Sequence, residues 1–198
     1  MVSSKPRSVI RFTAGIMLPA GACLVIGTLW HEVIGHGFAG ILAGGRVERV
    51  HILGVRIWPA VGWDGWTGQY GNCEVTGIAS PRGQHWMALA GSGSTWLVSV
   101  VAVALLWWRR WGARMRFVLG WLGIWWIDLL TYTLPTWGLR RSILWGGRFS
   151  EPYEAAVGLG VPGGIFQTFV ILSSMALASL LIMALRRQPS GGPRDRAR

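Results

Sequence analysis

The sequence predicts an all-α integral membrane protein with about four transmembrane helices and a short β-containing loop after the first helix. Hydrophobic residues make up 52% of the 198 residues and charged residues only 14%. The apolar residues gather in runs of about 20, which is the length that crosses a bilayer as a helix. Arginines flank these runs, as they do at the ends of membrane spans. The length suits one compact membrane domain, over residues 12–185.

The first apolar run covers residues 12–42 and follows a basic segment, residues 1–11. As one helix it would be roughly 46 Å long, more than a hydrocarbon core of about 30 Å. Tilting or a kink at Pro19 would accommodate the excess, and Gly44-Gly45 is expected to end the helix. Residues 20–23 resemble a signal-peptide cleavage site, but we expect no cleavage there, because the apolar run continues past it.

Residues 46–84 form a connecting segment rich in Gly, Trp and Thr. One or two short strands are predicted in it by spaced apolar residues, namely Val47, Val50, Ile52, Val55 and Ile57. His51 is expected to be a solvated strand residue rather than a metal ligand, and Asp64 and Glu74 to be loop carboxylates.

Three further spans are predicted, over residues 86–108, 117–134 and 164–185. The second begins with small residues at 88–94, which allow close helix packing in lipid. The third contains Asp128 and should end at Pro135. Residues 138–163 are interpreted as a lid or a re-entrant segment, and residues 186–198 as a disordered basic tail.

The distribution of arginine predicts the orientation of the chain. Both termini and the loop 109–116 fall on one side, and they carry the densest Arg clusters, so that side should be cytoplasmic, in the cytoplasmic membrane of a bacterium. The net charge of +11 does not indicate nucleic-acid binding, because the arginines flank apolar runs instead of forming one face. Cys23 lies in an apolar run and Cys73 in a loop, so no disulfide is expected.

The motif that points to a function is His31-Glu32-Val33-Ile34-Gly35-His36, inside the first apolar run. Ionisable residues are costly at membrane depth and mark a functional site there. Two imidazoles can bind zinc, and a neighbouring carboxylate can take a proton from the metal-bound water. A structural role, with these side chains bonded to neighbouring helices, is the alternative.

The spacing of the two histidines is unusual. In the common zincin motif they stand at i and i+4, whereas His31 and His36 stand at i and i+5. On a regular helix these positions lie about 140° apart, too far to share one ion. A π-bulge, with about 4.4 residues per turn, would bring them within roughly 50° of each other. Gly35 would ease that distortion because it has no Cβ.

Asp128 is predicted to be the third metal ligand, because two His and one carboxylate form a common catalytic zinc set. Glu151 and Glu154, in the following loop, are rival ligands. A salt bridge to an Arg, or a hydrogen bond within the bundle, would account for Asp128 without a metal.

The motif resembles the HExxGH zinc motif of the dipeptidyl peptidase III family over six residues. Over about two-thirds of the chain, the order of motifs resembles the site-2 protease family of intramembrane zinc metallopeptidases. That order is the His31–His36 motif, a Gly-Gly-Arg-Val strand from Gly44, the small residues 89–93, and Asp128. The chain departs from that family by one extra residue in the motif, by Ser92 in place of Pro, and by the absence of Leu-Asp-Gly around Asp128.

The resemblance implies a zinc-dependent endopeptidase that acts in or near the membrane. His31, His36 and Asp128 would bind Zn²⁺, Glu32 would be the general base, and the substrate would be a membrane protein or peptide. A strand near residue 47 would pair with an extended substrate. The alternatives are a non-catalytic membrane protein of the same fold that binds other membrane proteins, and a membrane zinc hydrolase acting on other substrates.

Overall fold

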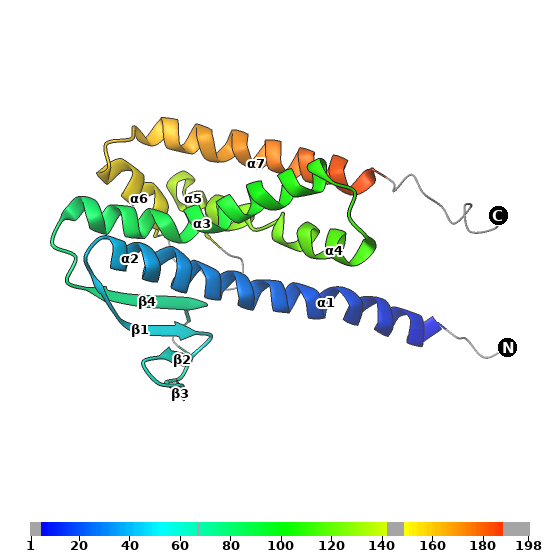
Figure 1. Cartoon of the computed structure of the whole chain (residues 1–198), viewed down its shortest axis with the longest axis horizontal. Helices are drawn as coiled ribbons and strands as arrows, with labels where there is room; N and C mark the ends of the chain where they lie inside the picture. The colour runs from blue at the N-terminus through cyan, green and yellow to red at the C-terminus, as the bar shows by residue number, and fades with distance from the viewer. Residues whose placement is uncertain (1–4, 67, 142–148, 188–198) are drawn as a thin grey trace.

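The computed structural model describes residues 5–66, 68–141 and 149–187. Within these ranges four helical segments are long and apolar enough to cross a membrane: Met17–Leu42, Pro81–Trp108, Ala113–Trp137 and Gly163–Arg186. They run along the long axis of the molecule, and the two ends of the chain lie at the same end of the bundle (Figure 1). The predicted fold class, a helical membrane protein with a small sheet after the first helix, is confirmed.

The first span is one long helical rod with a change of winding. Helix α1, Lys5–Trp30, continues as the π-helix η1, His31–Phe38, and then as α2, Ala39–Leu42. The predicted wide turn at the histidine motif is therefore confirmed. The helix begins at Lys5, within the basic segment and seven residues before the predicted start at residue 12. The helix continues through Pro19, and Gly44, at φ 85°, follows its end as predicted.

A four-stranded antiparallel sheet follows. Its strands are β1, Arg46–Ile52; β2, Val55–Trp58; β3, Gly62–Trp63; and β4, Gly71–Thr76, in the order β3-β2-β1-β4. The prediction of one or two strands was too low, because β3 is only two residues long and β4 begins Gly-Asn without apolar alternation. Glu74 lies in β4 rather than in a loop. His51 is bonded to Asp64 through Nε2 and Oδ2, which are 2.6 Å apart.

One face of β4 packs against the first span. Alternate residues of a strand point to the same face, and three of them meet this helix. A Cβ added to Gly71 would lie 2.5 Å from Oε1 of Glu32, and one added to Gly40 would lie 2.8 Å from Cγ1 of Val75. A Cβ on Gly37 would lie 3.6 Å from Sγ of Cys73. Strand β4 therefore lies alongside the part of the helix that carries the histidine motif, and β2 and β3 lie farther from that helix (Figure 1).

Helix α3, Pro81–Trp108, packs against every other described span and begins five residues before the predicted start. Its first turn is stabilised by Ser80, whose Oγ accepts a hydrogen bond from the backbone N–H of Gly83 at 2.9 Å. Pro81 occupies the first helical position, where a missing N–H does no harm.

The third span is not one continuous helix, contrary to prediction. It consists of α4, Ala113–Leu122; α5, Trp126–Thr133; and the 3₁₀ turn η2, Leu134–Trp137. Between α4 and α5 the backbone N–H groups of Ile124 and Trp125 bond to carbonyls three residues back, which tightens the winding. The break follows Gly123, which packs against α7 so closely that a Cβ would lie 2.9 Å from Leu181.

The chain then forms the short helix α6, Glu151–Gly158, and the last span α7, Gly163–Arg186. α6 packs against α3, α5 and α7. The interpretation of residues 138–163 as a lid or re-entrant segment falls partly outside the described residues. The predicted disorder after residue 187 also lies outside them.

Candidate metal centre

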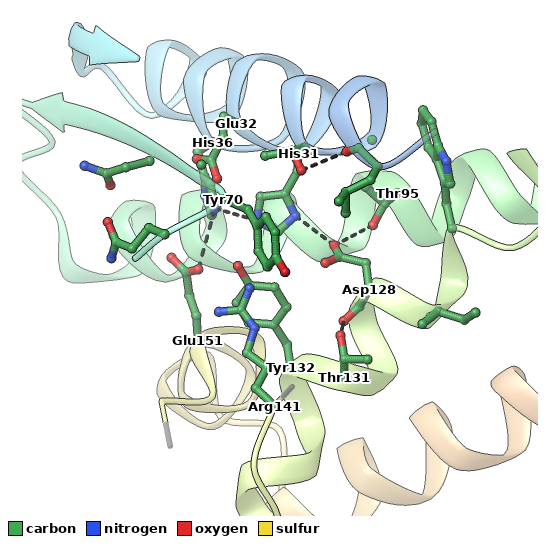
Figure 2. A pocket seen from close by; sticks show the side chains of 18 of the residues that line it. His31, Glu32, His36, Tyr70, Thr95, Asp128, Thr131, Tyr132, Arg141 and Glu151 are labelled. Atoms are coloured by element: carbon green, nitrogen blue, oxygen red, sulfur yellow. Dashed lines mark hydrogen bonds and ion pairs between the residues drawn. The ribbon is translucent and has the colours of Figure 1, made fainter. Parts of the chain in front are cut away.

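The residues of the histidine motif open into a cavity of about 690 Å³. Its walls come from α1, η1, α3, α5, α6 and the start of β4. His31, Glu32 and His36 are each only 5% exposed. Figure 2 shows the two imidazoles pointing into the cavity, with Asp128 and Thr95 on one side and Glu151 on the other.

The π-helix brings the two imidazoles together. Nε2 of His31 and Nε2 of His36 are 3.0 Å apart, and the ring planes cross at 70°. In a tetrahedral zinc site with Zn–N of about 2.0–2.1 Å, two nitrogens lie roughly 3.3–3.4 Å apart. A small adjustment therefore suffices for both nitrogens to bind one ion.

Both outer nitrogens are engaged as donors. Nδ1 of His31 donates to Oδ2 of Asp128 at 2.8 Å, and Nδ1 of His36 donates to the carbonyl of Met87 at 3.0 Å. With the hydrogen on each Nδ1, the lone pair of each neutral ring is on Nε2, and the two lone pairs face each other. Such outer hydrogen bonds are the usual support of metal-binding histidines.

Glu151 is the carboxylate on the Nε2 side of the pair. Its Oε2 lies 3.6 Å from Nε2 of His36, and His31, His36 and Glu151 each offer a ligand atom within 4.8 Å of the others. Among the described residues this is the group of three that can hold a metal ion. Of the two rival ligands named from the sequence, Glu151 therefore belongs to this group of three and Glu154 does not.

Asp128 lies near the centre but on the other side of His31. It accepts hydrogen bonds from Nδ1 of His31 and, at 2.9 Å, from Oγ1 of Thr95. In this arrangement Asp128 orients the imidazole of His31 and is not among the three chelating groups.

Two glycines create the space for an ion. Gly35 of η1 and Gly91 of α3 face each other so closely that a Cβ on Gly35 would lie 2.5 Å from Cα of Gly91. A Cβ on Gly91 would lie 2.5 Å from Nε2 of His36 and 2.6 Å from Nε2 of His31. Any side chain at Gly91 would therefore fill the place where both nitrogens can share an ion. The neighbouring Ser92, which replaces the expected Pro, is a fully buried residue of an uninterrupted helix.

Glu32 lines the same cavity as the two histidines. Its carboxylate packs against Gly71 at the start of β4, where a Cβ would lie 2.6 Å from Cγ of Glu32. Glu32 does not belong to the group of three candidate ligands, so its carboxylate lines the cavity without being one of them.

Two cavity residues were missed from the sequence. The ring of Tyr132 stacks on His31, with centroids 5.4 Å apart and planes 18° from parallel, and the guanidinium of Arg141 lies 3.0 Å from the centroid of Tyr132. Figure 2 shows this stack beside Glu151. An Arg in a loop and a Tyr in an apolar helix carry no spacing signal that would have identified them.

The protonation of two groups outside the spans follows from their burial. Burial raises the pKa of Glu151 above its ordinary value, and nearby His31 and Arg141 partly oppose that shift. Burial also raises the pKa of the Cys73 thiol to about 12, so the thiol stays protonated at neutral pH. Cys23 and Cys73 are both free cysteines.

Comparison of the chain with protein-family models, with curated protein sequences and with solved structures finds no match.

Proposed function

We propose that the chain is a zinc-dependent membrane endopeptidase that hydrolyses peptide bonds in or near the bilayer. The observation that supports this most is the pair of facing Nε2 atoms with the buried Glu32 beside them in one cavity. A purely structural metal site has no use for a further carboxylate that is not a ligand.

We assign His31, His36 and Glu151 as the zinc ligands. Two imidazoles and one carboxylate are a donor set that zinc accepts with a position left open. Zinc, when bound there, supplies a Lewis acid that polarises a carbonyl and makes water more acidic. In this assignment Asp128 is a positioning residue that holds the ring of His31 in place. This role replaces that of third zinc ligand, which we predicted from the sequence.

Two residues of the cavity have roles toward the substrate. Glu32 takes the proton of the attacking water and later gives it to the leaving amine. Arg141 lines the cavity, and its guanidinium group stacks on the ring of Tyr132. Among the described residues, no carboxylate lies within 4.0 Å of this guanidinium group. Its guanidinium is suited to stabilise the negative charge that develops on the carbonyl oxygen.

Strand β4 offers a place for the peptide. It is the last strand in the sheet order, so it pairs with β1 alone, and its residues Gly71, Asn72 and Cys73 line the cavity. An extended peptide that pairs with a strand edge is bound through its backbone, whatever its sequence. We propose that the substrate lies along β4 and reaches the centre beside Glu32.

The test is the zinc content of the detergent-purified full-length protein, followed by cleavage of casein as a general probe, with new peptide ends identified by mass spectrometry. We expect about one zinc per chain in the wild type. His36→Ala and Glu151→Gln should lose it, while Asp128→Asn should keep the stoichiometry but bind about 10–100-fold more weakly.

Glu32→Gln separates catalysis from binding. We expect it to retain zinc and to lose about 10²–10⁴-fold in cleavage rate. A wild-type protein that binds no zinc after reconstitution would overturn the proposal. Zinc binding without cleavage, or cleavage that survives Glu32→Gln, would instead favour a non-catalytic interaction protein or a different base.

A further inference from the structure

A second pocket, of about 450 Å³, lies at the end of the bundle where the chain termini emerge. It is formed where α3 ends, α4 begins and α7 ends (Figure 1). Arginine and tryptophan dominate its lining, which includes Trp107, Trp108, Arg109, Arg110, Trp111, Arg116 and Arg187. We propose that this pocket binds the phosphate group of an anionic phospholipid.

The charge of the pocket is unbalanced. Four arginines line it, and no Asp or Glu lines it among the described residues. The sequence has no acidic residue between Glu74 and Asp128, or between Glu154 and Asp195, so none lies in the helices that build it. An anion from outside the described chain is therefore the natural partner of these guanidinium groups.

Part of the pocket is already held in place by internal contacts. Arg116 donates to the carbonyls of Leu185 and Arg187, each at 2.8 Å, at the end of α7. Arg187 lies 3.5 Å from the ring centroid of Trp107, and Arg109 lies 5.1 Å from that of Trp111. The contacts of Arg116 and Arg187 fix the walls, while the guanidinium groups of the exposed Arg109, beside Trp111, and of the exposed Arg110 remain available for a ligand.

The location of the pocket favours a lipid over a soluble phosphate. It lies at the ends of three candidate spans, which is where the headgroups of a surrounding bilayer would be expected. The ring of Trp108 is 86% exposed there, in the position that Trp takes at a membrane interface. Basic pockets between spans bind anionic headgroups, and the guanidinium group can bind phosphate with two parallel hydrogen bonds.

The experiment is native mass spectrometry of the delipidated full-length protein with phosphatidylglycerol, with phosphatidylcholine as the zwitterionic competitor, whose phosphate charge is balanced by its own choline cation. We expect saturable binding that prefers phosphatidylglycerol. Arg110→Gln should weaken it about fivefold, and Arg109→Gln with Arg110→Gln about thirtyfold, at about 1 kcal/mol for each Arg. Arg114→Gln is the matched control, because Arg114 is exposed in the same segment but does not line the pocket.

Equal binding of the two lipids, or equal losses in Arg114→Gln and Arg110→Gln, would overturn the proposal. Inorganic phosphate that displaces the lipid at equal or lower concentration would also overturn it, by assigning the site to a soluble anion. The single variant Arg110→Gln keeps the test decisive if the double variant fails to fold. Zinc content provides an independent readout, since none of these residues lies near the metal centre.

Discussion

Gly91 leaves room between the two imidazoles because it has no Cβ. Gly91→Ala would place a methyl group 2.5 Å and 2.6 Å from the two Nε2 atoms. The backbones of Gly35 and Gly91 already pack closely, so the two imidazoles themselves would have to move to make room for the methyl group. We expect Gly91→Ala to lose zinc, measured by metal analysis of the purified protein.

Gly93→Ala is the matched control. Gly93 lies two residues further along the same helix, and a Cβ there meets nothing within 4 Å. It should keep the wild-type zinc content, and since Ala favours helix over Gly by roughly 1 kcal/mol, it should not lose stability. Equal zinc loss in both variants would mean that the small-residue patch matters for helix packing rather than for the ion.

Gly71 controls the position of Glu32 in the same way. Gly71→Ala would bring a methyl group to 2.5 Å from Oε1 of Glu32, and the three atoms nearest to it belong to Glu32 and Thr28. We expect the cleavage rate to fall at least tenfold while zinc content is unchanged, as Glu32 turns away from the water that it serves. Glu74→Ala, which lies in the same strand but does not line the cavity, should affect neither measurement.

The two histidines and Glu32 could be predicted as a site because ionisable side chains inside an apolar run are costly and are kept there for a function. The choice between Asp128 and Glu151 could not be made from the sequence. It depends on which histidine nitrogen each carboxylate approaches, Nδ1 of His31 for Asp128 and Nε2 of His36 for Glu151. That is decided by the break at Gly123 and by the placement of α6. No sequence pattern identified Tyr132 and Arg141 as site residues, because each is connected to the site by stacking, Tyr132 on His31 and Arg141 on Tyr132.

Among the elements, the start of α3 depends on one hydroxyl. Ser80→Ala removes the acceptor for the N–H of Gly83 and should destabilise the protein by about 1 kcal/mol. Unfolding of the reconstituted protein by denaturant would measure this difference. Ser80→Asp restores an acceptor and should recover most of the loss. A loss that Asp does not reverse would point to a role of this residue outside the cap.

The elements differ in how far the sequence predicts them. Long apolar runs and the extra residue of the motif correctly indicated the spans and the wide turn at His31–Phe38. The strand β4 was missed because Gly71 and Asn72 disfavour strands, and it forms because β1 and the helix behind it supply partners. The break in the third span was missed because this span is apolar around the break, and a single Gly is not enough to predict an interruption of the helix.

At the scale of the whole molecule, we predict an orientation with both termini and the Arg-rich loop in the cytoplasm. In a variant with Cys23→Ser and Cys73→Ser, a new thiol at Ala60→Cys should react with a membrane-impermeant maleimide on intact cells. A thiol at Arg114→Cys should react only after the membrane is permeabilised. Both positions are exposed, so the reverse pattern would show the opposite insertion.

The π-helix also limits how far an extra residue in the histidine motif affects the rest of the chain. One more residue in an α-helix turns everything beyond it by about 100° and moves it by about 1.5 Å. The wide turn at His31–Phe38 takes up such a residue, so α2 leaves the motif with Gly40 still facing Val75 of β4. The chain can therefore carry the longer spacing between His31 and His36 without re-orienting the sheet, because the extra residue is absorbed within one stretch of helix.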